Sequence, residues 1–367
     1  MSGEKMILVL CLALACSAQL ACTTITCGTN TAPYCYFYNP ATTSAVSSKC
    51  SSGTYCPFSY SATTADYQCT AEGPTPVTYN ALPGEKCNTT NQCITETTCS
   101  SSTGLCVGLT LNTPCSSTNV CNPGLYCKAS STTVSSCQNL LVAGAVCNVY
   151  TDYCIYGYEC NFGTCQKILS TPSGTHVDYA LCSLGGYSFM CRYGECYDTN
   201  STHSLCINPI VNNLAYNEPC TTCEGTGITL GVTYTRTGDC ACGLGGKSYC
   251  PGFGGDEYGS KAFELAREYY LSSDIAKCNV AAGLRCMKDH WDSDDYWEYQ
   301  YYNWLSSERW KYIGAEECAY QNLDAFYTTL KKEYDNAESS SSDSSSDSSS
   351  SGAETLVLSA FVLSLVA

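Results

Sequence analysis

Apolar side chains recur at helical spacing in the last third of the chain, from about Asp256 onward. The second of three such stretches opens at Ser293 among acidic residues, which suit a helix N-terminus, and it closes at Gly314. The third covers residues 316–336 and has lysines near its end. The apolar positions of the three stretches are Phe263, Ala266 and Tyr270; Trp297, Tyr301 and Trp304; and Leu323, Phe326 and Leu330. We therefore predict a small, Tyr/Trp-rich α-helical subdomain over residues 256–337.

The chain begins with an apolar run that is too short to span a bilayer. It follows Lys5 and ends in small residues, a pattern that is typical of a secretory signal peptide. We predict that residues 1–18 are removed by cleavage after Ala18.

The chain ends with a second short apolar run, residues 355–367, behind a Ser/Asp-rich stretch at 338–354 that we expect to be disordered. Small residues, a polar spacer and a short apolar tail are typical of attachment to glycosylphosphatidylinositol (GPI), after which the tail is removed. Counting back from the tail places the lipidated residue near Ser344. The alternative is a disordered terminus that happens to be apolar, but a signal peptide at the other end favours the lipid anchor.

Between these ends the cysteines fall into groups with a repeat of about 30 residues, a period that is typical of small stacked units. We predict tandem four-cysteine repeats over residues 81–210, an N-terminal Cys-rich module over 19–80 and a Cys/Gly-rich connector over 211–255. The cysteines of the repeats are Cys87, Cys93, Cys99 and Cys106; Cys115, Cys121, Cys127 and Cys137; Cys147, Cys154, Cys160 and Cys165; and, with looser spacing, Cys182, Cys191, Cys196 and Cys206. Each unit is too small to bury an adequate core, so disulfides must replace packing.

One motif occurs three times, as "CSSGTYC", "CNPGLYC" and "CIYGYEC". Its central glycines, Gly53, Gly124 and Gly157, stand where a chain that doubles back needs positive φ, so we predict a short strand, a glycine turn and a short strand. Such a ribbon is barely stable alone, whereas each disulfide contributes about 2 to 4 kcal/mol. No acid, base or nucleophile recurs in the motif, so we interpret it as a structural staple. The pairing stays open, because four cysteines allow three connectivities.

The cysteine content indicates an oxidising compartment. The chain has 32 Cys in 367 residues, a density that is typical of secreted disulfide scaffolds. Loss of the signal peptide leaves 30 of them, an even number that permits complete pairing. The connector and the helical part each hold an odd number, so we expect at least one disulfide between the helical part and the loop-rich part.

Several clusters have the residue types of reactive sites, and we interpret each as structural. "CTTC" at 220–223 and "CAC" at 240–242 resemble a redox motif or a zinc-binding set, but an oxidising compartment favours disulfides. The acidic segment 289–298 lacks the glycine and the alternating ligands of a calcium loop and suits a helix start. His176 and His203 lie in separate segments with no hydrolase motif nearby. We therefore predict no catalytic, metal-binding or cofactor-binding residue, and no enzyme.

Two sequons, at Asn88 and Asn200, are candidate N-glycosylation sites, because the predicted secretory route exposes them to glycosylation.

The segments from "GEKC" through "CNPGLYC" to "CIYGYECNFGTC" resemble the Dickkopf N-terminal-like cysteine-rich repeats that are common in surface proteins of ciliated protozoa. Those proteins run from a signal peptide, through repeats, to a Tyr-rich helical segment and a Ser-rich, GPI-anchored tail. "YCPGFGGDEY" and "CMKDHWD" resemble parts of that helical segment, so the likeness covers most of the mature chain. It implies a location on the outer face of the plasma membrane and nothing about a Wnt-type ligand.

Two functions from different classes fit these features. The first is a non-enzymatic, GPI-anchored coat or antigen protein, for which dense disulfides, sugars and a formal net charge of −16 are suitable. The second is a recognition or adhesion module that binds an extracellular protein or glycan through Trp297, Tyr301 and Trp304. The acidic charge repels phosphate backbones, so we expect no nucleic-acid partner.

Overall fold

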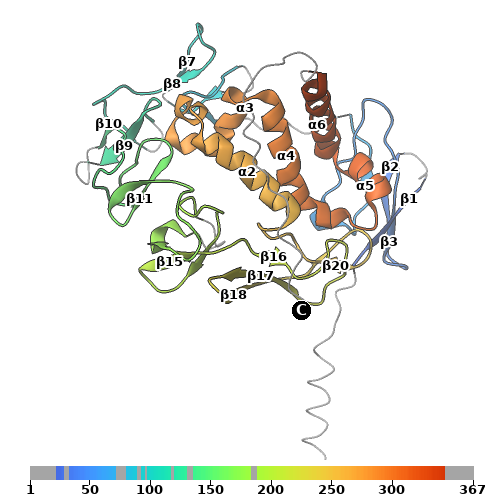
Figure 1. The fold of residues 1–367 in the computed structure, drawn as a ribbon. Coiled ribbons are helices and arrows are strands. Elements are labelled where there is room, and N and C mark those ends of the chain that lie inside the picture. The colour runs from blue at the N-terminus through green and yellow to red at the C-terminus, as the bar shows by residue number, and fades with distance from the viewer. Residues whose placement is uncertain are drawn as a thin grey trace, which may run out of the picture.

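Short strand pairs occupy the first two thirds of the described chain and helices occupy the last third (Figure 1). The computed structural model describes residues 22–28, 33–71, 80–88, 92–95, 97–116, 120–129, 135–182 and 188–343. The predicted signal peptide, Ser344 and the apolar tail lie outside these residues. The order of elements confirms the predicted fold class of small disulfide-rich repeats followed by a small α-helical subdomain.

The N-terminal module is a four-stranded sheet in the order β1-β3-β2-β4. Its elements are β1 (Thr24–Cys27), β2 (Tyr34–Asn39), β3 (Ser44–Ser47), the 3₁₀-helix η1 (Tyr60–Ala62) and β4 (Tyr67–Gln68). Strand β1 runs parallel to β3, whereas β2 pairs antiparallel with β3 and β4. Ile25 and Tyr36 are buried in one core cluster with Trp304 and Leu305 of the helical subdomain. The sheet therefore shares its core with the helices.

Each four-cysteine repeat contains one antiparallel hairpin, and its third and fourth cysteines face each other across the two strands. The hairpins are β7 (Thr98–Cys99) with β8 (Cys106–Val107), β9 (Leu125–Ala129) with β10 (Ser135–Asn139), β11 (Tyr158–Asn161) with β12 (Thr164–Lys167), and β14 (Cys196–Asp198) with β15 (His203–Cys206). Further short elements are β5 (Asn80–Ala81), β6 (Gln92–Cys93), β13 (His176–Asp178) and η2 (Tyr179–Leu181). The fourth repeat keeps this hairpin in spite of its looser cysteine spacing.

The connector brings the chain back to the N-terminal sheet. It contains the hairpin β17 (Cys223–Thr229) and β18 (Val232–Gly238), flanked by β16 (Val211–Asn212), and then the pair β19 (Ala241–Cys242) and β20 (Ser248–Tyr249). The backbone N–H of Ile25 donates to the carbonyl oxygen of Leu244 at 2.7 Å. The Cys22–Cys242 disulfide lies next to this contact.

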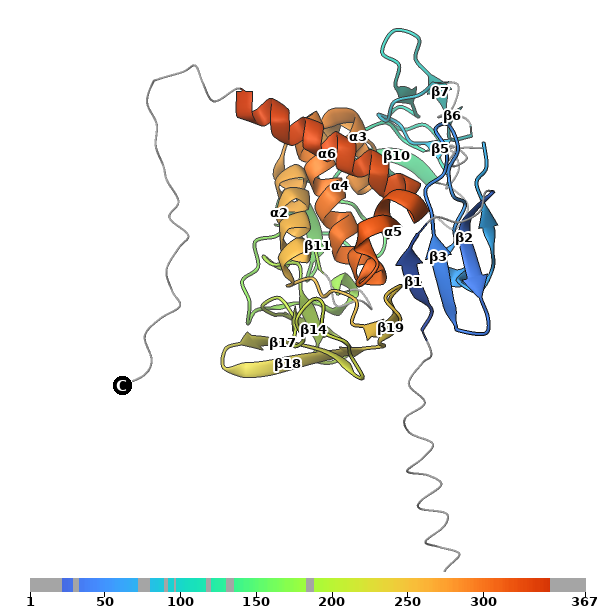
Figure 2. The same cartoon turned by 90° about the vertical axis from the view of Figure 1, so that its right-hand side faces the viewer.

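As a result, the described residues between 22 and 250 surround the helices, and we call this part of the molecule the ring (Figures 1 and 2). In Figure 1 the N-terminal sheet lies to the right of the helices, β7 and β8 lie at the upper left, β9 to β15 follow down the left side, and β16 to β20 lie below the helices.

The centre of the molecule consists of α2 (Glu257–Leu271), α4 (Ser293–Glu308) and α6 (Ala325–Asp343), with α4 packed against both of the others (Figure 2). The shorter elements are η3 (Asp274–Lys277), η4 (Val280–Cys286), α3 (Met287–His290), η5 (Arg309–Tyr312) and α5 (Glu316–Leu323). Because α4 is covered on two sides, it buries aromatic residues on two faces. Trp304 belongs to the core cluster shared with α5 and α6, and Tyr299 to the one shared with α2.

The third predicted helix is in fact two helices. Asp324 has φ −122° and ψ 88°, which ends α5, and its Oδ1 then accepts a hydrogen bond from the backbone N–H of Tyr327 in the first turn of α6 at 2.8 Å. The break turns Phe326 outward, where it is 56 % exposed, so its predicted place on the buried face is wrong.

Helix α6 continues to Asp343, into the first part of the Ser/Asp-rich stretch. Among the helices of the described residues, none has the length and apolarity required to cross a bilayer.

Candidate functional site

The 30 cysteines of the described residues form 15 disulfides with a recurring order. In six units of four cysteines the first bonds to the third and the second to the fourth, once Cys22, Cys27 and Cys242, which form long-range disulfides, are left out of the count. These pairs are Cys35–Cys56 and Cys50–Cys69, Cys87–Cys99 and Cys93–Cys106, Cys115–Cys127 and Cys121–Cys137, Cys147–Cys160 and Cys154–Cys165, Cys182–Cys196 and Cys191–Cys206, and Cys220–Cys240 and Cys223–Cys250. The N-terminal module and the connector thus share the connectivity of the repeats.

The other three disulfides lie outside this order. Cys22–Cys242 closes the ring, Cys27–Cys318 joins the N-terminal sheet to α5, and Cys278–Cys286 closes a loop between α2 and α4. Cys27–Cys318 confirms the expected bridge between the helical part and the loop-rich part. The disulfide interpretation of "CTTC" and "CAC" is also confirmed, because their four sulfurs belong to three different disulfides and cannot act together as thiolate ligands.

The three motif glycines occupy tight turns with positive φ: +84° at Gly53, +80° at Gly124 and +77° at Gly157. In each turn the residue after the glycine donates its backbone N–H to the carbonyl oxygen three residues earlier, at 3.0 to 3.1 Å, and the glycine has the position that a type II turn reserves for it. A Cβ atom at any of these positions would meet nothing within 4 Å, so φ and not close packing requires glycine. The predicted ribbon is wrong in one respect. The turns at Gly124 and Gly157 lead into the first strand of a hairpin whose partner strand follows the third cysteine.

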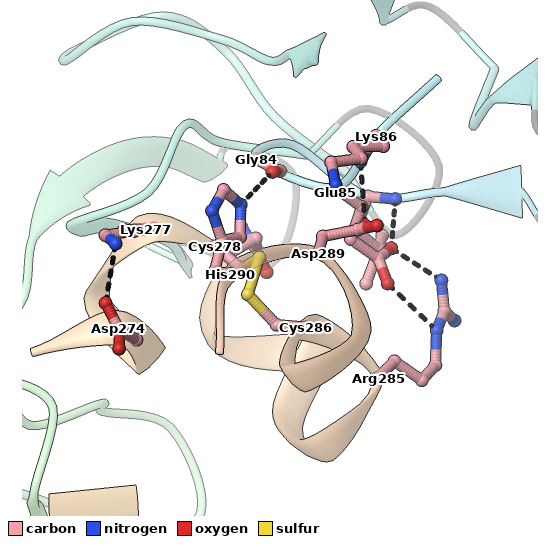
Figure 3. Close-up of a disulfide and its surroundings, with 12 residues drawn as sticks. Gly84, Glu85, Lys86, Asp274, Lys277, Cys278, Arg285, Cys286, Asp289 and His290 are labelled. Carbon is pink, nitrogen blue, oxygen red and sulfur yellow. Dashed lines mark hydrogen bonds and ion pairs between the residues drawn. A yellow bond between two sulfur atoms is a disulfide. The ribbon is translucent and has the colours of Figure 1, made fainter. Parts of the chain in front are cut away.

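The first repeat docks on the disulfide loop 278–286 and on α3 (Figure 3). Arg285 donates from Nη2 and Nε to the two carboxylate oxygens of the buried Glu85, at 2.6 and 3.2 Å. The carbonyl oxygen of Gly84 lies 2.7 Å from Nε2 of His290, and the backbone N–H of Lys86 donates to Oδ2 of Asp289 at 2.8 Å. A bidentate guanidinium–carboxylate pair of this kind is geometrically specific, so it fixes the orientation of the repeat.

The second and third repeats dock on the same loop. The side-chain amide of Asn279 donates to the carbonyl oxygen of Cys121 at 2.8 Å. The hydroxyl group of Tyr156 donates to the carbonyl oxygen of Cys278 and accepts from the backbone N–H of Gly124 at 3.2 Å. The loop therefore aligns three repeats on the helices.

The contacts of the acidic segment 289–298 show that two of its aspartates have structural roles. Asp289 holds the first repeat, and Asp292 caps α4 by accepting from the backbone N–H of Asp294 at 2.9 Å. The helix start that we predicted there is present, with its cap one residue before Ser293.

Two of the three candidate contact residues on α4, Tyr301 and Trp304, pack against other helices. Trp304 is 5 % exposed and packs against Tyr312 and Tyr327, so it cannot form part of an exposed contact patch, and its assignment there is wrong. Tyr301 is half-buried and stacks on Tyr334 with ring centroids 4.1 Å apart; Trp297 is half-buried beside Tyr296. Binding of a partner through Trp297 and Tyr301 stays a prediction.

Both sequon asparagines are exposed. The Oδ1 atom of Asn200 accepts from the backbone N–H and the hydroxyl group of Thr202, at 2.9 and 2.8 Å. The two threonines of the Asn88 sequon lie outside the described residues. Sugar attachment at either asparagine stays a prediction.

Two histidines that the sequence separates meet in the fold, on β13 and β15. The rings of His176 and His203 have centroids 5.7 Å apart. Within the described ranges, neither histidine belongs to a cluster of three or more candidate metal ligands.

A cavity with a volume of about 490 Å³ lies between the fourth repeat and the helices, and it was not foreseen from the sequence. Residues of the loop that precedes β14 form one wall, and residues of α2, η4 and α4 form the other. The two walls meet at two places. The ring centroids of Phe189 and Tyr270 lie 4.8 Å apart. The backbone of Gly194 packs so closely against the ring of Phe263 that an added Cβ atom would lie 2.4 Å from it.

Glu195 lines this cavity and is 1 % exposed. Its Oε2 forms an ion pair with Nη2 of Arg236 at 3.1 Å, whereas its Oε1 has no partner among the described residues. Burial raises the pKa of Glu195 to about 7, although Arg236 acts in the opposite direction. The sequence held one signal, since Glu195 immediately precedes the third cysteine of its repeat, the position of the buried Tyr126 in the second repeat.

The raised pKa of Glu195 predicts a pH-dependent stability. The folded state binds this proton more tightly than the unfolded chain, whose carboxyl has the ordinary value of 4.5. The contribution of protonated Glu195 to the free energy of unfolding is therefore fully present below pH 4.5 and is lost as the pH rises through about 7. We expect the thermal midpoint to fall across this interval, and Glu195→Gln to flatten the decline. Calorimetric scans of both proteins between pH 4 and pH 8 measure this, and equal slopes would contradict it.

Comparison with known proteins yields no match: no family model, no curated protein and no solved structure is significantly similar to this chain.

Proposed function

We propose that this protein is a non-enzymatic, GPI-anchored coat or antigen protein of the cell surface. The observation that carries the proposal is the disulfide framework, in which six small units repeat one connectivity and two long-range bonds join the chain's distant parts. Such dense cross-linking fits an extracellular role, because disulfides persist only in oxidising compartments.

The position of the proposed anchor agrees with the fold. Helix α6 leaves the core and ends at Asp343, immediately before the proposed lipid-attachment residue Ser344. An anchor there would tether the molecule through α6 and leave the ring facing the surroundings. A lipid with two chains suffices for lasting attachment, at about 0.8 kcal/mol per buried methylene.

We expect a phosphatidylinositol-specific phospholipase to release the protein from intact cells. The measurement is the amount in the supernatant before and after treatment. A chain that ends at Glu354 is the control, since without its apolar tail it should appear in the medium with no lipase. Protein that stays on the membrane and still contains the peptide 355–367 would refute the anchor.

A recognition or adhesion role is the second candidate, and one observation favours it. The third repeat exposes large apolar side chains, with Val146 84 % and Tyr150 81 % exposed and Val142 beside them in the sequence. A coat has no need of these side chains, whereas a surface that binds a protein or a glycan uses them. Binding of the released protein to a glycan or cell-surface protein array would distinguish the two roles.

A further inference from the structure

We propose that the cavity between the fourth repeat and the helices binds an uncharged, mainly apolar small molecule that carries one hydroxyl or carbonyl group. The proposal goes beyond the coat function and does not depend on the lipid anchor. It rests on the volume of the cavity, the chemistry of its walls and two buried polar atoms, Oε1 of Glu195 and Nε of Arg267, that have no partner among the described residues.

The walls and the size indicate the apolar body of the ligand. The side chains of Leu181, Phe189, Phe263 and Leu284 line the cavity. Its volume of about 490 Å³ falls within the range of about 300 to 1,000 Å³ that is typical of small-molecule pockets. The cavity also lies at the interface between the fourth repeat and the helical subdomain, and small-molecule pockets are common at such interfaces.

Two buried polar atoms without a partner indicate the single oxygen of the ligand. Glu195 is almost completely buried, and while its Oε2 faces Arg236, its Oε1 has no partner among the described residues. The Nε atom of Arg267, a residue that also lines the cavity, is likewise buried and without a partner in the described part of the chain, although the side chain as a whole is 35 % exposed. Buried polar groups in native proteins are nearly always hydrogen-bonded, and an unmade bond is costly. A ligand oxygen can accept from Nε of Arg267 or, as a hydroxyl, donate to Oε1 of Glu195.

The charges around the cavity indicate that the ligand is neutral. The carboxylate of Glu195 already faces the guanidinium of Arg236 at 3.1 Å, and Nη1 of Arg267 lies 3.3 Å from a carboxylate oxygen of Glu264. An anionic or cationic head group would therefore find no unpaired charge of opposite sign in the cavity. The free-energy cost of removing that head group from water would then oppose binding.

The test uses the purified protein and the fluorescent sterol dehydroergosterol as probe. We expect saturable binding of one probe per chain, displacement by 1-decanol, and little displacement by decanoate. Glu195→Leu should weaken binding about tenfold or more, because one buried hydrogen bond is lost, whereas Glu195→Gln should retain most of it.

Ala180→Trp supplies a second variant, because Ala180 is exposed at the rim and a large ring there narrows the cavity without entering the core. The matched control is Glu268→Trp, which places the same ring on the exposed face of α2. Loss of binding in the first and retention in the second supports the site, even where Glu195→Leu fails to fold. The proposal is overturned by an absence of saturable binding, by equal binding of the two tryptophan variants, or by decanoate that competes as well as 1-decanol.

Discussion

Removal of Cys22–Cys242 and Cys27–Cys318 together, by replacing all four cysteines with alanine, is expected to lower the stability of the whole protein. The two bonds join residues 220 and 291 positions apart in the sequence, and a disulfide restricts the unfolded chain more when it closes a longer loop. Other bridges shorten the effective loops, so we estimate a loss of about 3 to 5 kcal/mol for each bond. The thermal midpoint should then fall by about 10 °C or more.

The matched control removes Cys93–Cys106, whose partners are 13 positions apart. Its loss should loosen the first repeat and leave hydrogen exchange in α4 unchanged, because α4 belongs to the shared core. In the four-alanine variant exchange should instead rise in both β1 and α4. Equal midpoints for the two variants would show that packing alone holds the ring to the helices.

Gly84→Ala is expected to detach the first repeat from the helices. Gly84 has φ +92°, and a Cβ atom there would lie 2.2 Å from the carbonyl oxygen of Lys277 and 2.7 Å from Cα of Cys278. Both atoms belong to backbone that is held by the Cys278–Cys286 disulfide and by the hydrogen bond from Asn279 N–H to the carbonyl oxygen of Pro83. The backbone of Lys277 and Cys278 therefore cannot move away, and we expect the substitution to lower the free energy of unfolding by about 3 kcal/mol or more.

Gly124→Ala is the control, because its φ is also positive but its Cβ position is empty. It should cost only the strain of the left-handed region, about 1 to 2 kcal/mol. Thermal unfolding gives the two costs, and faster hydrogen exchange at residues 80–88 and 277–290 in the Gly84 variant locates the damage. Equal costs would mean that the docking is not tight.

The parts of the fold that depend on neighbouring residues could be predicted from the sequence. Helices α2 and α4 follow from apolar spacing, and the repeats follow from the cysteine period. Gly124 was identified because a sharp turn needs positive φ, which is a property of the local chain.

The parts that depend on distant residues could not be predicted. Nothing around Cys242 indicates that its partner is Cys22 rather than a cysteine nearby. Trp304 appeared suited to a contact surface because the periodicity of α4 does not reveal that the helix is covered on two sides. The place of Glu195 before the third cysteine of its repeat indicates burial, but the cavity that it lines forms only where the fourth repeat meets α2.

The two long-range disulfides also determine what happens when an extracellular protease cuts the chain once. A break anywhere between Cys27 and Cys318 leaves the two halves covalently joined through Cys27–Cys318, and every break between Cys27 and Cys242 is bridged a second time by Cys22–Cys242. If the protein is anchored at Ser344 as proposed, a single cut in this range would therefore free no fragment from the cell. Release of such an anchored protein would require a cut after Cys318 and before the anchor, so residues 319–344 are the segment at which one cut would free the whole molecule.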